Sequence, residues 1–281
     1  MSDYILMAVA LFPAIVLCIY VFKKDRVDKE PIGLLLKLFA FGAIICFPAA
    51  EIELFLAGIT ESLFSPETLE IAKAGGNIPY TKEAYMYIFT DNIIGVALVE
   101  ESLKFLVLVY FTRKNKEFNS LFDGLIYAVF VSLGFAALEN IFYVVENGLY
   151  VGIMRAVLSV PGHMFFAVMM GYHYSMWHLT DKAAAVEKDL KTQGMINLNS
   201  PLFSSGKEIA LCLIIPALAH GLYNSLCTIG ILWSTLLLYV FVIFMYVHCF
   251  GKIRKMSKAD DFDNVYVQYI LTKKYPKLLD K

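Results

Sequence analysis

The sequence places ionisable residues inside long apolar stretches, where charges are costly unless they face a protein interior and find partners. Glu100, Glu101 and Lys104 lie roughly midway along one such stretch. On a helix, Lys104 shares a face with Glu100 at i+4 and with Glu101 at i+3. One glutamate can therefore pair with the lysine while the other faces a cavity. A purely structural ion pair that fixes helix packing would explain the same spacing.

Three further apolar stretches carry polar residues near their middles. Their members are Glu139 and Asn140 in the first, Arg155 and His163 in the second, and His220 and Asn224 in the third. His220 and Asn224 are one helical turn apart, so that their imidazole and amide can contact the same small chemical group. Because four successive stretches carry such groups, one polar pocket shared between the helices is favoured over a separate structural role in each helix.

Carboxylates and imidazoles in a dry pocket suit two hydrolytic mechanisms. In the first, a glutamate acts as general base on a water molecule while His and Asn stabilise the oxyanion. In the second, carboxylate and imidazole ligands hold a zinc ion that activates the water. The candidate zinc ligands are then Glu100, Glu139, His163 and His220. Both mechanisms hydrolyse amides.

Two other functions fit some of these residues. A proton- or cation-coupled transporter would also place Glu, Lys and His in its spans as a relay. The sequence has no internal repeat of the kind that builds the two halves of many transporters. A scaffold or receptor with a decayed pocket is the third alternative, although all the candidate positions are occupied.

The elements that must position these residues are membrane-spanning helices. Hydrophobic residues make up 59% of the chain and charged residues 17%, which is typical of a membrane protein rather than a soluble domain. Continuous apolar runs favour helices over the alternating strands of a barrel. The sequence therefore predicts an all-α polytopic membrane protein with about seven spans, at about Tyr4–Phe22, Ile32–Ile59, Tyr85–Phe111, Phe122–Val145, Tyr150–His178, Glu208–Gly230 and Ile231–Phe250.

Basic residues beside the spans predict the orientation, because Lys and Arg collect on the cytoplasmic side. They follow the first, third, fifth and last of these stretches, whereas the loop with Glu61, Glu67, Glu70 and Glu83 has no such excess of basic residues. We expect the N-terminus outside and the C-terminus inside, with a transmembrane domain at residues 1–250 and a cytoplasmic basic tail at residues 251–281. This tail is expected to form either an amphipathic helix on the inner leaflet or a solvated extension.

Charge and cysteine content narrow the remaining classes. The net charge of -1 gives no indication of nucleic acid binding. All five cysteines lie in apolar stretches without paired-ligand spacing, so small buried hydrophobic residues are favoured over disulfides or a thiolate metal site.

The order and spacing of several motifs resemble the PrsW family of intramembrane proteases, over about Asp28 to Asn224. These motifs are Asp28-Lys29-Glu30-Pro31, Glu100-Glu101-Ser102-Leu103-Lys104, Phe122-Asp123-Gly124-Leu125-Ile126-Tyr127, Gly134-Phe135-Ala136-Ala137-Leu138-Glu139-Asn140, Arg155 with His163, Gly171-Tyr172, and His220-Gly221-Leu222-Tyr223-Asn224. One departure is Asn224, where some members carry aspartate. This departure slightly weakens the metal hypothesis and leaves hydrolysis intact.

The resemblance implies a role for each candidate residue. Glu100 would activate the water, supported by Glu101 and Lys104, and Glu139 would take the second catalytic position. The glutamate mechanism, with no cofactor, is therefore preferred, and zinc is the alternative. His220 and Asn224 would stabilise the oxyanion, and His163 is the further histidine expected of the family. The supporting residues would also include Asn140 and Arg155.

The resemblance also implies a substrate and a location. The protein would lie in a bacterial plasma membrane and make the first cut in a membrane-anchored anti-sigma factor, a single-span protein, during envelope or antimicrobial-peptide stress. Such a substrate must enter laterally between helices. Pro48 and Pro161-Gly162 are positions at which the helices are expected to bend.

Overall fold

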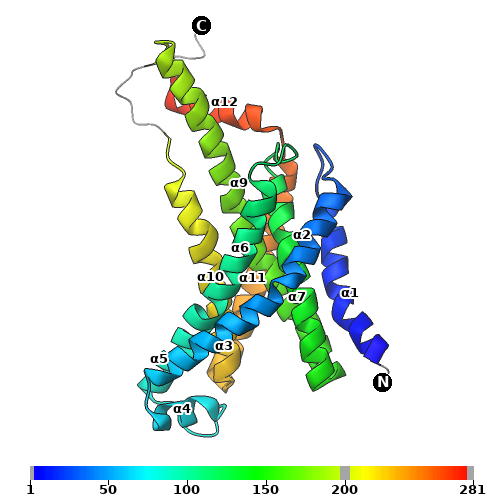
Figure 1. Cartoon of the computed structure of the whole chain (residues 1–281), viewed down its shortest axis with the longest axis vertical. Helices are drawn as coiled ribbons and strands as arrows, with labels where there is room; N and C mark the ends of the chain where they lie inside the picture. Colours follow the sequence, from blue (N-terminus) through cyan, green and yellow to red (C-terminus); the bar gives the residue numbers. More distant parts are fainter. Residues whose placement is uncertain (1–2, 197–202, 277–281) are drawn as a thin grey trace.

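The computed structural model describes residues 3–196 and 203–276, nearly all of them helical (Figure 1). The only strand-like pairing within these ranges is a single bridge between Ser120 and Phe262. The all-α class is confirmed. In chain order the helices are α1 (Asp3–Phe22), α2 (Ile32–Ile44), α3 (Cys46–Ser62), α4 (Pro66–Lys73), α5 (Lys82–Thr90), the π-helix η1 (Asp91–Ala97), α6 (Leu98–Thr112), α7 (Asp123–Asn147), α8 (Leu149–Val157), α9 (Ser159–Thr192), α10 (Gly206–Ile229), α11 (Leu232–Lys258) and α12 (Asp263–Lys274).

Five helical stretches in the described part of the chain are long and apolar enough to cross a membrane: Ile32–Ser62, Asp123–Asn147, Leu149–Thr192, Gly206–Ile229 and Leu232–Lys258. A shorter apolar helix covers Leu6–Phe22. The predicted span Tyr85–Phe111 is helical throughout, as parts of α5, η1 and α6, but lies outside this group of five. The chain is a multi-pass membrane protein, and the count of seven spans stays a prediction.

Two of the long stretches are interrupted close to their prolines. The first is divided at Ile45 between α2 and α3, and the second at Leu158 between α8 and α9. In each case the proline, Pro48 or Pro161, falls in the first turn of the second helix. A proline is tolerated there because its missing N–H has no helical partner to bind.

Helix α7 forms the centre of the bundle. Nearly all of its residues from Asp123 to Ala137 are buried, and it packs against α1, α2 and α9. A Cβ atom added at Gly42 of α2 would lie 2.0 Å from the carbonyl oxygen of Val131, and one at Gly134 of α7 would lie 2.0 Å from that of Phe39. Small residues at these crossings let the two backbones approach closely, as is common between membrane helices.

Helices α4 and α12 lie at opposite ends of the long axis of the molecule (Figure 1). Helix α1 begins toward the α4 end, and α12 lies beside the last turns of α9. Val267 and Leu271 of α12 pack against Ala183 of α9, and His178 Nε2 lies 2.9 Å from the carboxylate of Asp263.

Part of the predicted tail is therefore a helix docked on α9 rather than a solvated extension. Helix α11 also continues past the predicted boundary at residue 250 and ends at Lys258. Residues 277–281 of the tail lie outside the described residues.

Candidate active site

The paired glutamates lie at the start of α6, directly after η1, and both contact one lysine. Lys104 Nζ donates to Glu100 Oε2 at 2.8 Å and to Glu101 Oε1 at 2.8 Å. The lysine is 1% exposed, and its ammonium also lies 4.2 Å from the ring centre of Phe135. We expected one glutamate to take the lysine and the other to face a cavity. Instead, the lysine pairs with both carboxylates.

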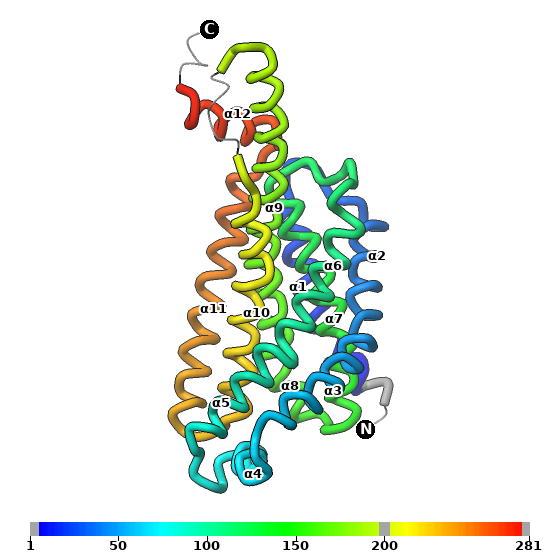
Figure 2. The backbone as a smooth tube through the Cα atoms, turned by 60° about the vertical axis from the view of Figure 1, so that its left-hand side comes forward, coloured from blue at the N-terminus to red at the C-terminus, as the bar shows by residue number. Residues whose placement is uncertain are grey.

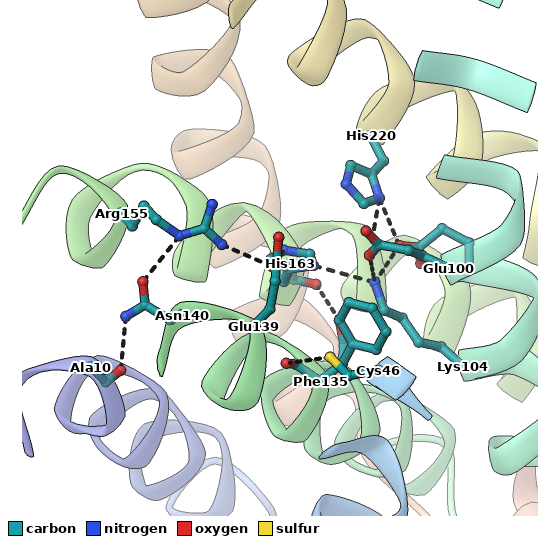
Figure 3. A network of polar contacts seen from close by, with 12 residues as sticks. Ala10, Cys46, Glu100, Lys104, Phe135, Glu139, Asn140, Arg155, His163 and His220 are labelled. Carbon is teal, nitrogen blue, oxygen red and sulfur yellow. Dashed lines mark hydrogen bonds and ion pairs between the residues drawn. The ribbon is translucent and has the colours of Figure 1, made fainter. Parts of the chain in front are cut away.

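His220 on α10 reaches the same carboxylates from the other side (Figure 3). Its Nδ1 lies 3.0 Å from Glu101 Oε1 and 4.0 Å from Glu100 Oε2. Its ring stacks on Phe166, with 4.7 Å between the ring centres. Because an ionised carboxylate only accepts hydrogen bonds, the contact with Glu101 places a proton on Nδ1 of His220. The Nε2 atom is then left for other partners.

His163 on α9 lies between Lys104 and Glu139, the third acid of the site. Its Nδ1 lies 3.3 Å from Lys104 Nζ, and its Nε2 lies 2.9 Å from Glu139 Oε2 on α7. Since the ammonium has only donors, Nδ1 accepts and Nε2 carries the proton toward Glu139. Lys104 therefore fixes the tautomer of His163.

The predicted supporting residues hold Glu139 in place. Arg155 Nη2 lies 2.8 Å from Glu139 Oε2, and Arg155 Nε donates to Asn140 Oδ1 at 3.0 Å. Asn140 Nδ2 in turn donates to the carbonyl oxygen of Ala10 at 2.9 Å. This chain of contacts ties α8, α7 and α1 together beside the site (Figure 3).

A cavity of about 450 Å³ adjoins these groups and separates the predicted residues into two sets. The residues on its wall are Glu100, Glu139, Arg155, His163, His220 and Asn224. The residues behind the wall are Glu101, Lys104 and Asn140, which are at most 1% exposed. The volume falls within the range of roughly 300–1,000 Å³ that is usual for ligand pockets.

The cavity wall also contains polar residues that the sequence analysis did not single out: Glu53 on α3, Asn92 on η1, Tyr143 on α7, and Tyr223 and Thr228 on α10. Glu53 had a detectable signal, because it is an ionisable residue inside a predicted span. Tyr223 lies within one of the quoted motifs. Asn92 had no comparable signal.

Four buried residues form a group that could hold a metal ion: Glu100, Glu101, His163 and His220. One donor atom from each lies within 4.8 Å of the others. The sequence-based set had Glu139 in place of Glu101. In the structure Glu139 lies beyond His163, on its Nε2 side.

Comparison with known proteins gives consistent matches. Residues 30–249 match the model of the PrsW family intramembrane metalloproteases. The chain is 30% identical over 258 residues to a curated Protease PrsW from Halalkalibacterium halodurans, covering 92% of this chain and 98% of the relative. Proteins of the same name from Clostridioides difficile and Bacillus subtilis are 29% and 27% identical, over 92% and 91% of this chain and 96% of each relative.

No solved structure matches the chain. The sequence matches do not favour the transporter alternative, because the family and all three relatives are named as proteases. The family match covers well over half of the chain and includes every residue of the polar cluster except Ala10. The chain belongs to the PrsW family of intramembrane proteases.

Proposed function

We propose that Glu100 activates the water that hydrolyses a peptide bond inside this cavity. The observation that carries the proposal is the division between the adjacent glutamates, since Glu100 lines the cavity and Glu101 lies behind its wall. A general base must be within hydrogen-bond reach of its water. Lys104 holds Glu100 by one oxygen, Oε2, so the other carboxylate oxygen is available to the water.

The other cavity residues take roles that their contacts support. Glu101 accepts from His220 Nδ1, and this contact orients the imidazole that stabilises the oxyanion. Asn224, one turn along α10, supplies an amide donor from the same wall. Glu139 fixes the ring of His163 and, with Arg155, takes the second position across the cavity.

Zinc is the second candidate for water activation. Carboxylates and imidazoles are suitable zinc donors, and Glu101 Oε2 is a buried oxygen without a hydrogen-bond partner in the described part of the chain. The residues present therefore fit a zinc ion, which Glu100, Glu101, His163 and His220 would hold. When bound, it would lower the pKa of a water molecule and polarise the peptide carbonyl. The ammonium of Lys104 contacts three of these four residues, and we therefore prefer the metal-free mechanism.

The substrate we propose is a single-span membrane protein, and specifically an anti-sigma factor in a bacterial plasma membrane. The family resemblance supports this choice. A site surrounded by membrane helices also agrees with it, since a membrane-embedded substrate can reach the cavity laterally from the lipid bilayer.

The test is cleavage of a co-reconstituted single-span substrate in liposomes by Glu100→Gln. This change keeps the shape and a hydrogen-bond acceptor for Lys104 but removes the base. We expect cleavage to fall at least a hundredfold, in line with the usual contribution of a general base of about 10²–10⁴. Glu146→Gln, at an exposed position of α7, is the matched control. Full activity of Glu100→Gln would reject the assignment.

Chelation separates the two mechanisms. Metal analysis of the purified protein and cleavage after exhaustive chelation should show less than stoichiometric zinc and retained activity. Activity that is lost on chelation and restored by zinc would instead establish the metal mechanism.

A further inference from the structure

A second cavity, of about 210 Å³, lies against the catalytic cavity at the α4 end of the molecule. Its walls come from α4 and the following loop, from α5 and η1, and from the end of α10. Asn92 and Thr228 line both cavities. By itself the second cavity is smaller than the usual ligand pocket of roughly 300–1,000 Å³. It is better explained as a continuation of the first.

The wall between the cavities is thin. Asn92 Nδ2 and Thr228 Oγ1 are 3.4 Å apart, longer than the usual 2.7–3.2 Å of an N–H···O bond. Each side chain has a second, shorter hydrogen bond, from Asn92 Nδ2 to Ile88 O at 2.8 Å and from Thr228 Oγ1 to Asn224 O at 2.9 Å. Separation of the two side chains would therefore leave neither of them without a partner.

The same two helices are held tightly at a neighbouring level. A Cβ atom added at Gly221 of α10 would lie 2.8 Å from the Cα atom of Ile93 in η1. About two turns further along α10, the hydrogen bond found between them in the described part of the chain is the long Asn92–Thr228 contact. The packing thus fixes α10 against η1 beside the catalytic residues, whereas the boundary between the two cavities depends on one long hydrogen bond.

The lining of the second cavity is suited to a polar chain rather than to an apolar span. It includes the polar residues Lys73, Tyr87 and Asp91. Lys73 lies 2.7 Å from Glu61 in an exposed ion pair, and Asp91 Oδ1 accepts from Thr60 at 2.8 Å. These groups keep further donor and acceptor capacity, which an extended peptide backbone can use.

We propose that the two cavities are one substrate cleft, in which the polar segment just outside the substrate's membrane span lies in the second cavity and passes between Asn92 and Thr228 toward Glu100. The cleft also supplies an aqueous route to the catalytic water from the α4 end. This inference rests on the proposed proteolytic function, and it adds a binding subsite with a defined direction.

The first test compares two single-span substrates in liposomes, one with a polar extension beyond its span at the α4 end and one that ends with the span. Lys73→Trp fills the second cavity from an exposed position, and Lys82→Trp, exposed on α5 outside the cavity, is the matched control. The preference is measured as kcat/KM for the extended substrate divided by kcat/KM for the short one. We expect Lys73→Trp to lower this ratio by roughly tenfold. An unchanged ratio would overturn the subsite.

The second test uses Cys227, which lines the catalytic cavity and is exposed, whereas Cys18, Cys46, Cys212 and Cys249 are buried. In sealed vesicles of known orientation, a charged, impermeant thiol reagent should label Cys227 from the α4 side, and Cys227→Ser should abolish that labelling. Thr228→Trp should slow the labelling. In the Glu100→Gln background, the extended substrate should protect Cys227 more than the short one.

Labelling only from the α12 side, or equal protection by both substrates, would contradict the cleft. These outcomes do not depend on turnover. If Glu100→Gln cleaved both substrates normally while the labelling pattern held, the proposed general base would fail and the cleft would stand.

Discussion

Lys104 is the residue on which the charge balance of the site depends. Its ammonium is buried and contacts Glu100, Glu101 and His163. Removing one member of a buried ion pair costs about 3–5 kcal/mol, because it leaves an uncompensated charge in a medium of low dielectric constant. The lysine is therefore expected to be essential for folding as well as for activity.

Lys104→Met should lower the free energy of unfolding by about 3–5 kcal/mol, measured by denaturant titration in detergent micelles. Adding Glu101→Gln should recover part of this loss, since it removes one of the two charges left without a partner. Lys82→Met, at an exposed position, is the control. Equal stability of Lys104→Met and the wild type would show that the carboxylates do not need the ammonium.

Glu53 offers a second test at the scale of a single residue. It is half-buried on the cavity wall, and within the described residues its carboxylate has no hydrogen bond or ion pair. We expect its carboxyl oxygens to bind N–H groups of the substrate. Glu53→Gln should raise KM severalfold, because the amide replaces one of the two acceptor oxygens with a donor, and it should not lower stability, because the carboxyl group has no partner to lose. Glu51→Gln, exposed on the same helix, should leave KM unchanged.

The sequence could predict which residues meet, but not which atoms pair. The sequence analysis named nine candidate residues, and the structure places all nine around one cavity or directly behind its wall. Whether Glu101 or Glu139 lies closest to His220 depends on distances between helices that no spacing along one chain contains. Glu53 shows the same limit, since Glu51 and Glu53 point about 200° apart on a helix. Only the packed structure shows which of them faces the cavity.

At the scale of the helices, the α2–α7 contact controls the position of Glu139. Gly42→Ala would place a methyl group 2.0 Å from the carbonyl oxygen of Val131, and the two helices would have to separate. Overpacking of this kind typically costs about 1–3 kcal/mol. We expect a lower melting temperature in micelles and reduced cleavage.

Gly33→Ala is the matched control for Gly42→Ala, because it lies on the same helix and a Cβ atom there meets nothing within 4 Å. It should leave the melting temperature close to that of the wild type. If both variants melted alike, close packing at Gly42 would not be a determinant of the fold.

The interruptions of the helices were predictable only in part. Pro48 and Pro161 indicated bends, and the breaks at Ile45 and Leu158 lie three residues before each of them. The π-helix η1 had no such signal, since its sequence, Asp91 to Ala97, contains no proline. Its wider turn reflects packing against α10 at Gly221. Wider turns of this kind occur often at functional sites.

For the whole molecule, the site lies closer to one end than the sequence suggested. Glu139 is about two turns from the end of α7 at Asn147 and about four turns from its start at Asp123. Helices α3, α5 and α8 converge at this same end, next to α4 (Figure 2). The basic segments after α1 and α6 and the end of α11 lie toward α12, at the other end.

This asymmetry gives the last prediction its direction. If Lys and Arg mark the cytoplasmic side, then the α12 end is cytoplasmic, and the catalytic cavity opens toward the outer face. A fluorescent protein fused at the C-terminus should fluoresce. Alkaline phosphatase, which needs an oxidising compartment for its disulfides, should be active when inserted in the loop between α4 and α5 and inactive in the loop between α6 and α7. The opposite pattern would reverse the topology and would require substrates to be cut at their cytoplasmic end.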